Sequence, residues 1–284
     1  MVSNMVNGLR FIIGSACNYD CLFCHHEGYE KPSTTAVMDK KLEMLYEYAV
    51  EKNIKDISIT GGEPFMYWDK LKKLLDLFSN ERFKITLNTN LSLADKYIDN
   101  LVNYKNIEYH VNFSSLKEDV HKKIIGRTYL EKLFNNLELF KLNKQNVCLN
   151  IPILKGINDN EIINILNYCK NNDFKARFLV LLPMNEEQTK YFFDVEDIIS
   201  SIPSSELIQK YSYGRYDVKS DIENYEIVKC LCIDKECERC MQTTYVHITP
   251  DLNLRMCMES KIEYNVDYSD ISTVTESFNK VLRR

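Results

Sequence analysis

Three cysteines near the amino terminus constrain this chain more than any other part of its sequence. Cys17, Cys21 and Cys24 are separated by three and then two residues. Three thiolates can hold three irons of a four-iron cluster, which leaves the fourth iron open to a small molecule. The alternative is a zinc knuckle, because His25 or His26 could complete a tetrahedral zinc site with the same thiolates.

A second motif favours the iron cluster over zinc. The segment Thr60–Pro64 has the sequence Thr-Gly-Gly-Glu-Pro and follows one strand and one helix later, whereas a structural zinc site needs no accompanying motif. Together the two motifs resemble the radical S-adenosylmethionine (SAM) superfamily. The resemblance implies that Cys17, Cys21 and Cys24 bind a four-iron, four-sulfur (4Fe-4S) cluster and that SAM chelates its open iron. It also implies reductive cleavage of SAM to a 5′-deoxyadenosyl radical, which abstracts hydrogen from a substrate.

Composition limits the remaining function classes. A length of 284 residues with 45% hydrophobic content is ample for one large α/β domain, or for a barrel with a smaller appendage. No apolar run approaches the roughly 20 residues needed to cross a bilayer, and the start of the chain is too polar for a signal peptide, so a cytoplasmic protein without a membrane partner is expected. The net charge of −5 provides no basic surface for a nucleic-acid polymer.

Cysteine usage supports metal or redox chemistry. Ten cysteines in a chain expected to remain in a reducing compartment are poor candidates for disulfides. Eight of them fall in two groups, within residues 17–24 and 230–257. Cys148 and Cys169 stand apart on a predicted strand and a predicted helix, where we expect both to be small buried hydrophobic residues.

The first two thirds of the chain alternate short apolar runs with amphipathic runs of helical length. This alternation predicts parallel strands joined by right-handed crossovers, in a barrel or an open doubly wound sheet. Six units favour an α/β fold with a partial (β/α)6 barrel of the TIM type. The predicted strands are Leu9–Gly14, Asp56–Thr60, Lys84–Asn88, Glu108–Phe113, Val147–Ile153 and Arg177–Leu182. The predicted helices are Lys40–Glu51, Lys70–Phe78, Ala94–Val102, Leu130–Leu142 and Asn160–Lys170, the last capped by Asn158-Asp159.

Beyond Pro183 the regular alternation stops. We therefore expect a radical SAM core barrel over residues 1–184 and a C-terminal region with an auxiliary iron–sulfur cluster over residues 185–284. Within the second region the sequence predicts a short helix, strand character, a hairpin and a closing helix. These elements span Val195–Ser201, Leu207–Tyr213, Thr244–Arg255 and Ile271–Leu282.

The motifs all follow predicted strands. Barrel active sites are built from the loops at the carboxyl ends of the strands, so one cavity is expected to collect these motifs. In chain order they are the cysteines after the first strand, Gly61-Gly62-Glu63 after the second, Thr89-Asn90 after the third, Ser114 after the fourth, Gly156-Ile157-Asn158 after the fifth and Pro183-Met184 after the sixth.

The superfamily resemblance implies a set of SAM contacts. Gly61 and Gly62 would let the backbone approach the ligand closely, Glu63 would accept a hydrogen bond from the SAM ammonium, and Phe23 would lie against the adenine. The other implied contacts are Thr89, Asn90 and Ser114 for the ribose and methionyl groups, Arg127 as a bidentate partner of the SAM carboxylate, and the loop residue Ile157.

The second cysteine group has two interpretations. Cys237 and Cys240 are separated by two residues, and Cys257 lies beyond the predicted hairpin. Paired cysteines that flank a hairpin suit a zinc ribbon. The presence of the N-terminal cysteine motif and of the Gly-Gly-Glu motif in the same chain favours an auxiliary iron–sulfur cluster instead. Cys230 and Cys232 compete for any fourth ligand position.

Over most of its length the sequence is similar to the GTP 3′,8-cyclase family of molybdenum cofactor biosynthesis. In that family the auxiliary cluster keeps an open iron that contacts the guanine, and arginines and lysines clamp the triphosphate. The segments that carry the similarity are Leu9-Arg10, 24–28, Thr60–Pro64, Thr89-Asn90, Gly126-Arg127, 156–161, Arg177-Phe178, 182–184 and the cysteines at 237, 240 and 257.

The phosphate clamp of that family is altered here. Only Arg10 and Arg177 remain as candidate substrate contacts, and five other basic positions are lost. Because each charge-assisted contact contributes on the order of 1.5–3 kcal/mol, the loss should weaken triphosphate binding severely. The replacing residues are Asp56, Ser58, Cys148, Gln242 and Thr244. The sequence therefore indicates a relative with a changed substrate.

Two enzymatic functions and one structural function follow. The favoured function is hydrogen abstraction from a small molecule, such as a nucleoside or a less phosphorylated nucleotide, for carbon–carbon bond formation or rearrangement. The alternative is a maturase that crosslinks, epimerises or otherwise modifies a ribosomal peptide, although the sequence shows no obvious N-terminal peptide-recognition domain before the first predicted strand at Leu9. Either enzyme needs a one-electron donor such as flavodoxin or ferredoxin. A zinc-bound scaffold, the third function, predicts no iron.

Overall fold

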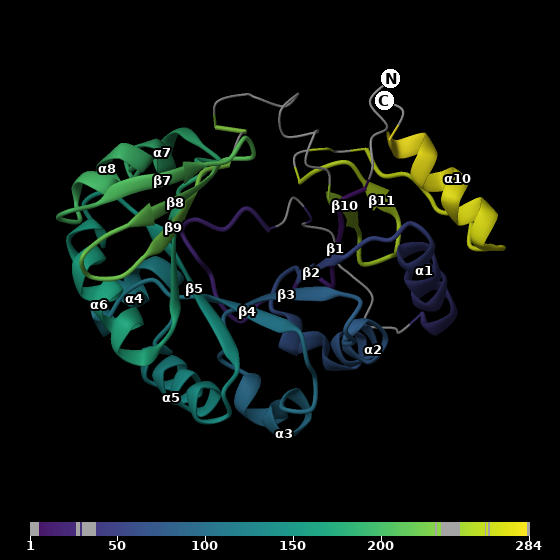
Figure 1. Cartoon of the computed structure of the whole chain (residues 1–284), viewed down its shortest axis with the longest axis horizontal. Coiled ribbons are helices and arrows are strands. Elements are labelled where there is room, and N and C mark those ends of the chain that lie inside the picture. The colour runs from purple at the N-terminus through teal and green to yellow at the C-terminus, as the bar shows by residue number, and fades with distance from the viewer. Residues whose placement is uncertain are drawn as a thin grey trace.

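The computed structural model of the chain describes residues 6–26, 29, 38–230, 232–233, 245–258, 260 and 262–282. Within these residues one sheet of eleven strands organises the molecule, in the order β11-β10-β1-β2-β3-β4-β5-β6-β9-β8-β7. The sheet is open, with β11 and β7 at its edges (Figure 1). The strands are β1 (Gly8–Ile12), β2 (Asp56–Thr60), β3 (Lys84–Thr89), β4 (Ile107–Asn112), β5 (Asn146–Ile153), β6 (Lys175–Val180), β7 (Glu206–Lys210), β8 (Arg215–Lys219), β9 (Tyr225–Val228), β10 (Tyr245–Ile248) and β11 (Leu254–Arg255).

Strands β1 to β6 are parallel and alternate with helices, as predicted. The strands curve, and α1, α2, α3, α5 and α6 lie on the outer side of the curve (Figure 1). The helices are α1 (Asp39–Glu51), α2 (Trp68–Phe78), α3 (Ile98–Leu101), α4 (Glu118–Ile125), α5 (Leu130–Leu142), α6 (Ile162–Asn172), α7 (Glu186–Thr189), α8 (Val195–Ser200) and α10 (Ile271–Leu282), and short 3-10 turns cover Pro64–Tyr67, Ala94–Tyr97 and Asp159–Glu161.

The two faces of the sheet differ in polarity. On β4, Ile107, Tyr109 and Val111 are buried in the apolar core, and the Tyr109 ring meets a ring of α5 edge-on. The alternate residues Glu108 and His110 therefore point to the other face, because successive strand side chains alternate. A fully covered parallel sheet is normally apolar on both faces, so the polar inner face indicates space for something other than core.

The predicted elements agree with the structure to within about two residues at most boundaries, but two details were wrong. The helix α4 was missed because it is only eight residues long. The strand character predicted around Leu207–Tyr213 is confirmed by β7, which pairs antiparallel with β8. Asn158 does not cap a helix; its side chain accepts from the Leu154 amide at 2.8 Å and donates to the carbonyls of Ser114 and Pro152, each at 2.8 Å.

The part of the chain beyond residue 184 extends the same sheet at both edges. Strand β9 pairs in parallel with β6, and β10 pairs in parallel with β1. Helix α10 packs against α1, where the rings of Tyr48 and Phe278 stack with their centroids 3.9 Å apart. The sheet therefore continues without a break across residue 184. No helix in the described part of the chain has the length and apolar character needed to cross a membrane.

Phe278→Ala should destabilise the whole domain, because the Phe278 ring is fully buried between α10 and α1. We expect a loss of about 3–5 kcal/mol in the free energy of unfolding, measured by denaturant titration. Leu142→Ala is the matched control, since Leu142 ends α5 and is 71% exposed. An unchanged midpoint for Phe278→Ala would show that α10 is not part of the core.

Candidate active site

The cysteine loop follows β1 and is fixed by the end of α4. The Asp20 amide donates to the Ile125 carbonyl at 3.0 Å, and the Leu22 amide donates to the Ile124 carbonyl at 2.8 Å. These carbonyls belong to the last turn of α4, which has no intrahelical donors for them. The two hydrogen bonds thus pair the amides of the cysteine loop with the last carbonyls of α4, and they fix the path of the loop.

Two asparagines from neighbouring strands reach the first two thiols. Asn90, after β3, donates its side-chain amide to Cys17 Sγ at 3.8 Å, and Asn112, at the end of β4, donates to Cys21 Sγ at 3.7 Å. Burial raises the pKa of Cys17 to about 11 and also raises that of Cys21. Metal coordination reverses this preference by deprotonating a thiol outright, and N–H donors aimed at sulfur suit a bound thiolate.

The third thiol contacts a candidate zinc ligand. The His26 amide donates to Cys24 Sγ at 3.4 Å, and its ring Nδ1 lies 3.7 Å from the same sulfur. Among the described residues, no three His, Cys, Asp or Glu side chains converge so as to hold one metal ion. Ligation of a 4Fe-4S cluster does not require such convergence, because each thiolate binds a different iron.

The glycines after β2 pack against the cysteine loop. The Gly62 amide donates to the Gly14 carbonyl at 2.8 Å, and the Glu63 amide donates to the Ala16 carbonyl at 2.9 Å. A Cβ on Gly62 would overlap the Ala16 carbonyl. Gly61 has φ +141°, a conformation that side chains rarely adopt. The glycines were predicted to let the backbone approach a ligand. In this structure they let the backbone after β2 approach the backbone of the cysteine loop.

Glu63 is a fully buried carboxylate that joins its own loop to the loop after β3. Its Oε1 accepts from the Thr89 hydroxyl at 2.7 Å and the Phe65 amide at 3.2 Å, and its Oε2 accepts from the Asn90 amide at 2.8 Å. Burial raises the Glu63 pKa to about 7, although these three donors favour the charged form. Glu63 and Thr89 were each predicted to contact SAM and here contact one another. Oε2 still has acceptor capacity for a ligand ammonium.

Ser114 acts on the cysteine loop through Asn112. The Ser114 side chain is fully buried, and its hydroxyl donates to Asn112 Oδ1 at 3.3 Å. This contact orients the amide of Asn112 toward Cys21. The predicted direct contact between Ser114 and SAM stays a prediction.

Phe23 and Ile157 come together beside the cysteines, from loops after β1 and β5. Ile157 belongs to a small apolar cluster with Tyr19, Ile124, Ile125 and Leu154, and Phe23 and Cys21 pack against it. Such a surface beside a candidate cluster suits the flat face of an adenine.

Arg127 is exposed one residue after the C-cap of α4, and its Nη1 donates to the Gly126 carbonyl at 3.3 Å.

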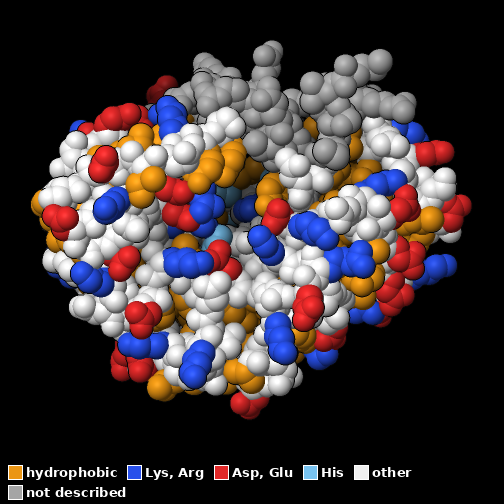
Figure 2. Space-filling model, viewed as in Figure 1, with side chains coloured by type: hydrophobic (Ala, Val, Ile, Leu, Met, Phe, Trp, Pro, Cys, Tyr) orange, Lys and Arg blue, Asp and Glu red, His pale blue; other side chains and the backbone are white. Residues whose placement is uncertain are grey.

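The inner face of the sheet surrounds a cavity of about 1040 Å³. Figure 2 shows a hollow at the centre of this view, with acidic, basic and histidine side chains around it. Both predicted substrate contacts line the cavity. Arg10 donates to the Ser58 hydroxyl at 3.1 Å, and Arg177 donates through Nε to Glu226 at 2.7 Å.

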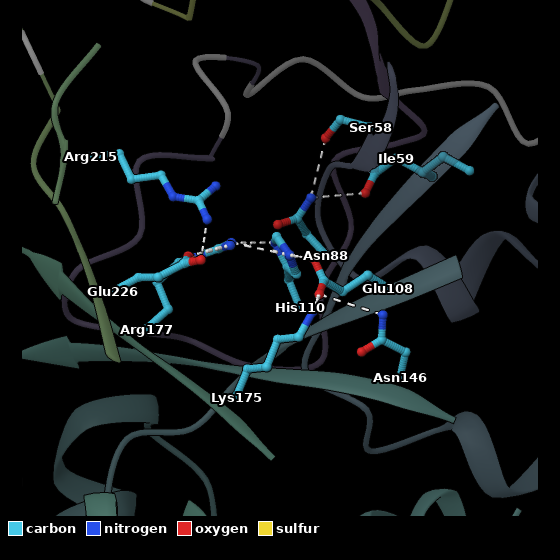
Figure 3. A network of polar contacts seen from close by, with 10 residues as sticks. All are labelled: Ser58, Ile59, Asn88, Glu108, His110, Asn146, Lys175, Arg177, Arg215 and Glu226. Atoms are coloured by element: carbon cyan, nitrogen blue, oxygen red, sulfur yellow. Dashed lines mark hydrogen bonds and ion pairs between the residues drawn. The ribbon is translucent and has the colours of Figure 1, made fainter. Parts of the chain in front are cut away.

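Sequence reasoning missed most of the polar residues in this cavity. Glu108, His110 and Arg215 line the cavity and form a network with Arg177, which Glu226 of β9 completes (Figure 3). The signal was present in the alternation of polar and apolar residues along each strand, since polar residues two apart share one face.

The cavity and the cysteine loop share one row of residues. The strand register aligns Asn112, Asn150, Arg177 and Glu226 across β4, β5, β6 and β9. At roughly 4.8 Å per strand, Arg177 lies about 10 Å along the sheet from the residue that bonds Cys21. A molecule bound at the Arg177 end of the cavity would therefore lie about 10 Å from Asn112, the side chain that contacts Cys21.

The other cysteines divide into two sets. Cys148 and Cys169 are buried, as predicted, but only Cys169 lies in the apolar core. Cys148 shares one face of β5 with the cavity-lining Asn146 and Asn150, and burial raises its pKa to about 12. Cys230, Cys232 and Cys257 are half-buried. Cys237 and Cys240, with Gln242 and Thr244, lie outside the described residues, so the auxiliary cluster stays a prediction.

Comparison with known proteins identifies the class. The family model of the radical SAM superfamily matches residues 11–189, which include the end of β1, the cysteine loop and β2 to β6. The chain belongs to the radical SAM superfamily, and it is a radical SAM enzyme. The family is expected to bind a 4Fe-4S cluster and SAM, and the cysteine loop described above supplies the thiol ligands that such a cluster needs.

Curated relatives are GTP 3′,8-cyclases. The chain is 28% identical over 273 residues to the GTP 3′,8-cyclase of Clostridium botulinum, with 92% of this chain and 84% of the relative covered. It is 24% identical over 271 residues to the probable GTP 3′,8-cyclase of Methanococcus aeolicus, with coverage of 89% and 85%.

Solved structures with a similar fold include one with a bound peptide and one with bound AdoMet. Streptococcus suis SuiB bound to the precursor peptide SuiA has a TM-score of 0.70 at 15% identity, with 95% of this chain and 65% of SuiB covered. The chain thus spans slightly less than two thirds of SuiB. The enzyme anSMEcpe with bound AdoMet has a TM-score of 0.63 at 16% identity, with coverage of 97% and 82%.

Gly62→Ala should disrupt the cysteine loop, because the added Cβ would overlap the Ala16 carbonyl. After anaerobic reconstitution we expect the variant to retain less than about half of the wild-type iron, since backbone in a packed loop yields poorly to a clash. Gly156→Ala is the control: its φ is also restrictive at +72°, but no atom lies within 4 Å of the added Cβ. Full iron content in Gly62→Ala would contradict the packing described here.

Proposed function

We propose that this radical SAM enzyme cleaves SAM reductively at a cluster held by Cys17, Cys21 and Cys24 and abstracts hydrogen from a small molecule in the inner cavity. The proposed outcome is carbon–carbon bond formation or rearrangement on a nucleoside or a less phosphorylated nucleotide, in a reaction similar to that of the GTP 3′,8-cyclases. The observation that supports this most is the shared row of residues from the cysteine loop to Arg177.

The bound cluster would supply the electron that splits SAM into methionine and an organic radical. The chain's own residues would hold and orient the reactants. Phe23 and Ile157 offer an apolar surface for adenine, and Glu63 retains an acceptor site for the SAM ammonium. Arg127, beside the loop, would bind the SAM carboxylate as a bidentate partner.

Residues 1–184 are proposed as the catalytic core, a partial (β/α)6 barrel, and residues 185–284 as the region of an auxiliary cluster with ligands Cys237, Cys240 and Cys257 and either Cys230 or Cys232. The six parallel β/α units support the first assignment. The half-buried Cys230, Cys232 and Cys257 are consistent with the second. A one-electron donor such as flavodoxin or ferredoxin would reduce the catalytic cluster.

Modification of a ribosomal peptide is the second candidate. The cavity, at about 1040 Å³, has room for more than a nucleoside, and SuiB, which shares the fold, binds a precursor peptide. A peptide encoded beside the gene that becomes modified would favour this candidate. A nucleoside or nucleotide that becomes modified, or that suppresses uncoupled SAM cleavage, would favour the first.

The two cysteine groups should differ in function. After anaerobic reconstitution, wild-type protein with dithionite should convert SAM to 5′-deoxyadenosine. Cys24→Ala should abolish this conversion, because the catalytic cluster would lose one of three ligands. Cys257→Ala should keep at least about half of it and lose product formation on a true substrate, because the auxiliary site is not needed to split SAM. Zinc in place of iron, or equal effects of the two substitutions, would refute this division.

A further inference from the structure

Two arginines in the cavity share one carboxylate. Arg177 donates from Nε to Glu226 Oε2 at 2.7 Å, and its Nη2 lies 2.7 Å from the same oxygen. Arg215 bonds the other oxygen, Oε1. The side chains of Arg177 and Glu226 are 12% and 24% exposed, so the pair is well shielded from solvent. Glu226 thus occupies the position between two guanidinium groups that a phosphate would otherwise take.

The contacts continue on the other side of Arg177 (Figure 3). Its Nη1 donates to His110 Nδ1 at 2.8 Å, and His110 Nε2 then donates to Glu108 at 2.9 Å. Glu108 also accepts from Lys175. Because a neutral imidazole has one donor and one acceptor nitrogen, the two contacts of His110 are compatible without a charge on its ring.

The charges in this network are balanced. Lys175, Arg177 and Arg215 contribute three positive charges, and Glu108, Glu226 and Asp217, which lies 3.6 Å from Arg215 Nε, contribute three negative charges. The rest of the cavity wall repeats the balance, since Arg10 and Lys84 face it together with Asp56 and Glu81. A polyphosphate would have to displace an internal carboxylate or leave it uncompensated, and a buried unpaired charge is costly.

One amide in the same row lacks a partner. Asn150 lines the cavity between Asn112 and Arg177, and its Oδ1 is buried without a hydrogen bond from the described residues. A buried acceptor of this kind needs a donor. Once the amide turns toward the cavity, an N–H or O–H group on a ligand would satisfy it, whereas a phosphate oxygen would not.

We propose that the cavity binds a phosphate-free, hydrogen-bonding small molecule and that Glu226 determines this specificity by occupying the anion position between Arg177 and Arg215. The proposal rests on the proposed function, in which this cavity receives the substrate. It specifies the substrate class as a nucleoside-like or other polar molecule without a polyphosphate chain.

The test is binding of inorganic tripolyphosphate, measured by calorimetry on reconstituted full-length protein. The wild-type protein should show no saturable binding of tripolyphosphate at concentrations up to about 1 mM. Its Kd for tripolyphosphate is therefore expected to be weaker than about 1 mM. Glu226→Gln should gain at least about tenfold in affinity, because Arg177 and Arg215 lose the negative charge that they share and can make charge-assisted hydrogen bonds to the added anion. Glu81→Gln removes the same charge from the cavity wall at an exposed position and should behave as wild type.

Micromolar binding of tripolyphosphate to wild type would overturn the proposal, and this result does not depend on how the variant folds. Equal affinity of Glu226→Gln and Glu81→Gln, with both proteins folded by circular dichroism, would also overturn it. SAM cleavage by the same preparations separates this inference from the proposed function. Cleavage with tight polyphosphate binding refutes only the specificity of the cavity, and loss of cleavage in the wild type refutes the proposed function itself.

Discussion

The buried carboxylate of Glu63 connects the parts of the candidate active site. Its side chain holds the loop after β3 through Thr89 and Asn90, and its amide holds the loop after β1 through the Ala16 carbonyl. A carboxylate without solvent is tolerated only where donors surround it, so the three loops have little freedom to separate. Asn90 then extends the same network to Cys17. The geometry of the cysteine loop thus depends on the hydrogen bonds that Glu63 and Asn90 make to it.

The polar inner face of the sheet provides the second half of the site. Barrel interiors in this fold class are often filled by branched apolar side chains, whereas here the inner positions of β2 to β6 carry Ser58, Asn88, Glu108, Asn150 and Arg177. Several of these residues form ion pairs or hydrogen bonds, and the cavity that they line includes Asn150, the β5 neighbour of Asn112. Asn112 in turn contacts Cys21, so the polar face and the cysteine loop are one strand apart at this point.

Much of the fold could be predicted from the sequence, because hydrophobic periodicity is strong in long helices and buried strands. The motifs also placed the cysteines, the glycines and Glu63 at one end of the sheet. What could not be predicted was how polar side chains divide their hydrogen bonds. Glu63 and Thr89 bond each other, Asn158 joins two strand ends, and Glu226 holds Arg177 from a strand about 50 residues further along the chain. Such partners depend on strand order and register, which local patterns do not specify.

The central claim is that three thiolates leave one iron open and that SAM binds there directly. Electron–nuclear double resonance on the reduced protein with isotopically labelled SAM tests it most directly, because a hyperfine coupling requires contact between ligand and cluster. The account predicts couplings to the labelled amino nitrogen and carboxylate of SAM, and their persistence in Cys257→Ala. An intact amino-terminal cluster that shows no coupling to either label would contradict it.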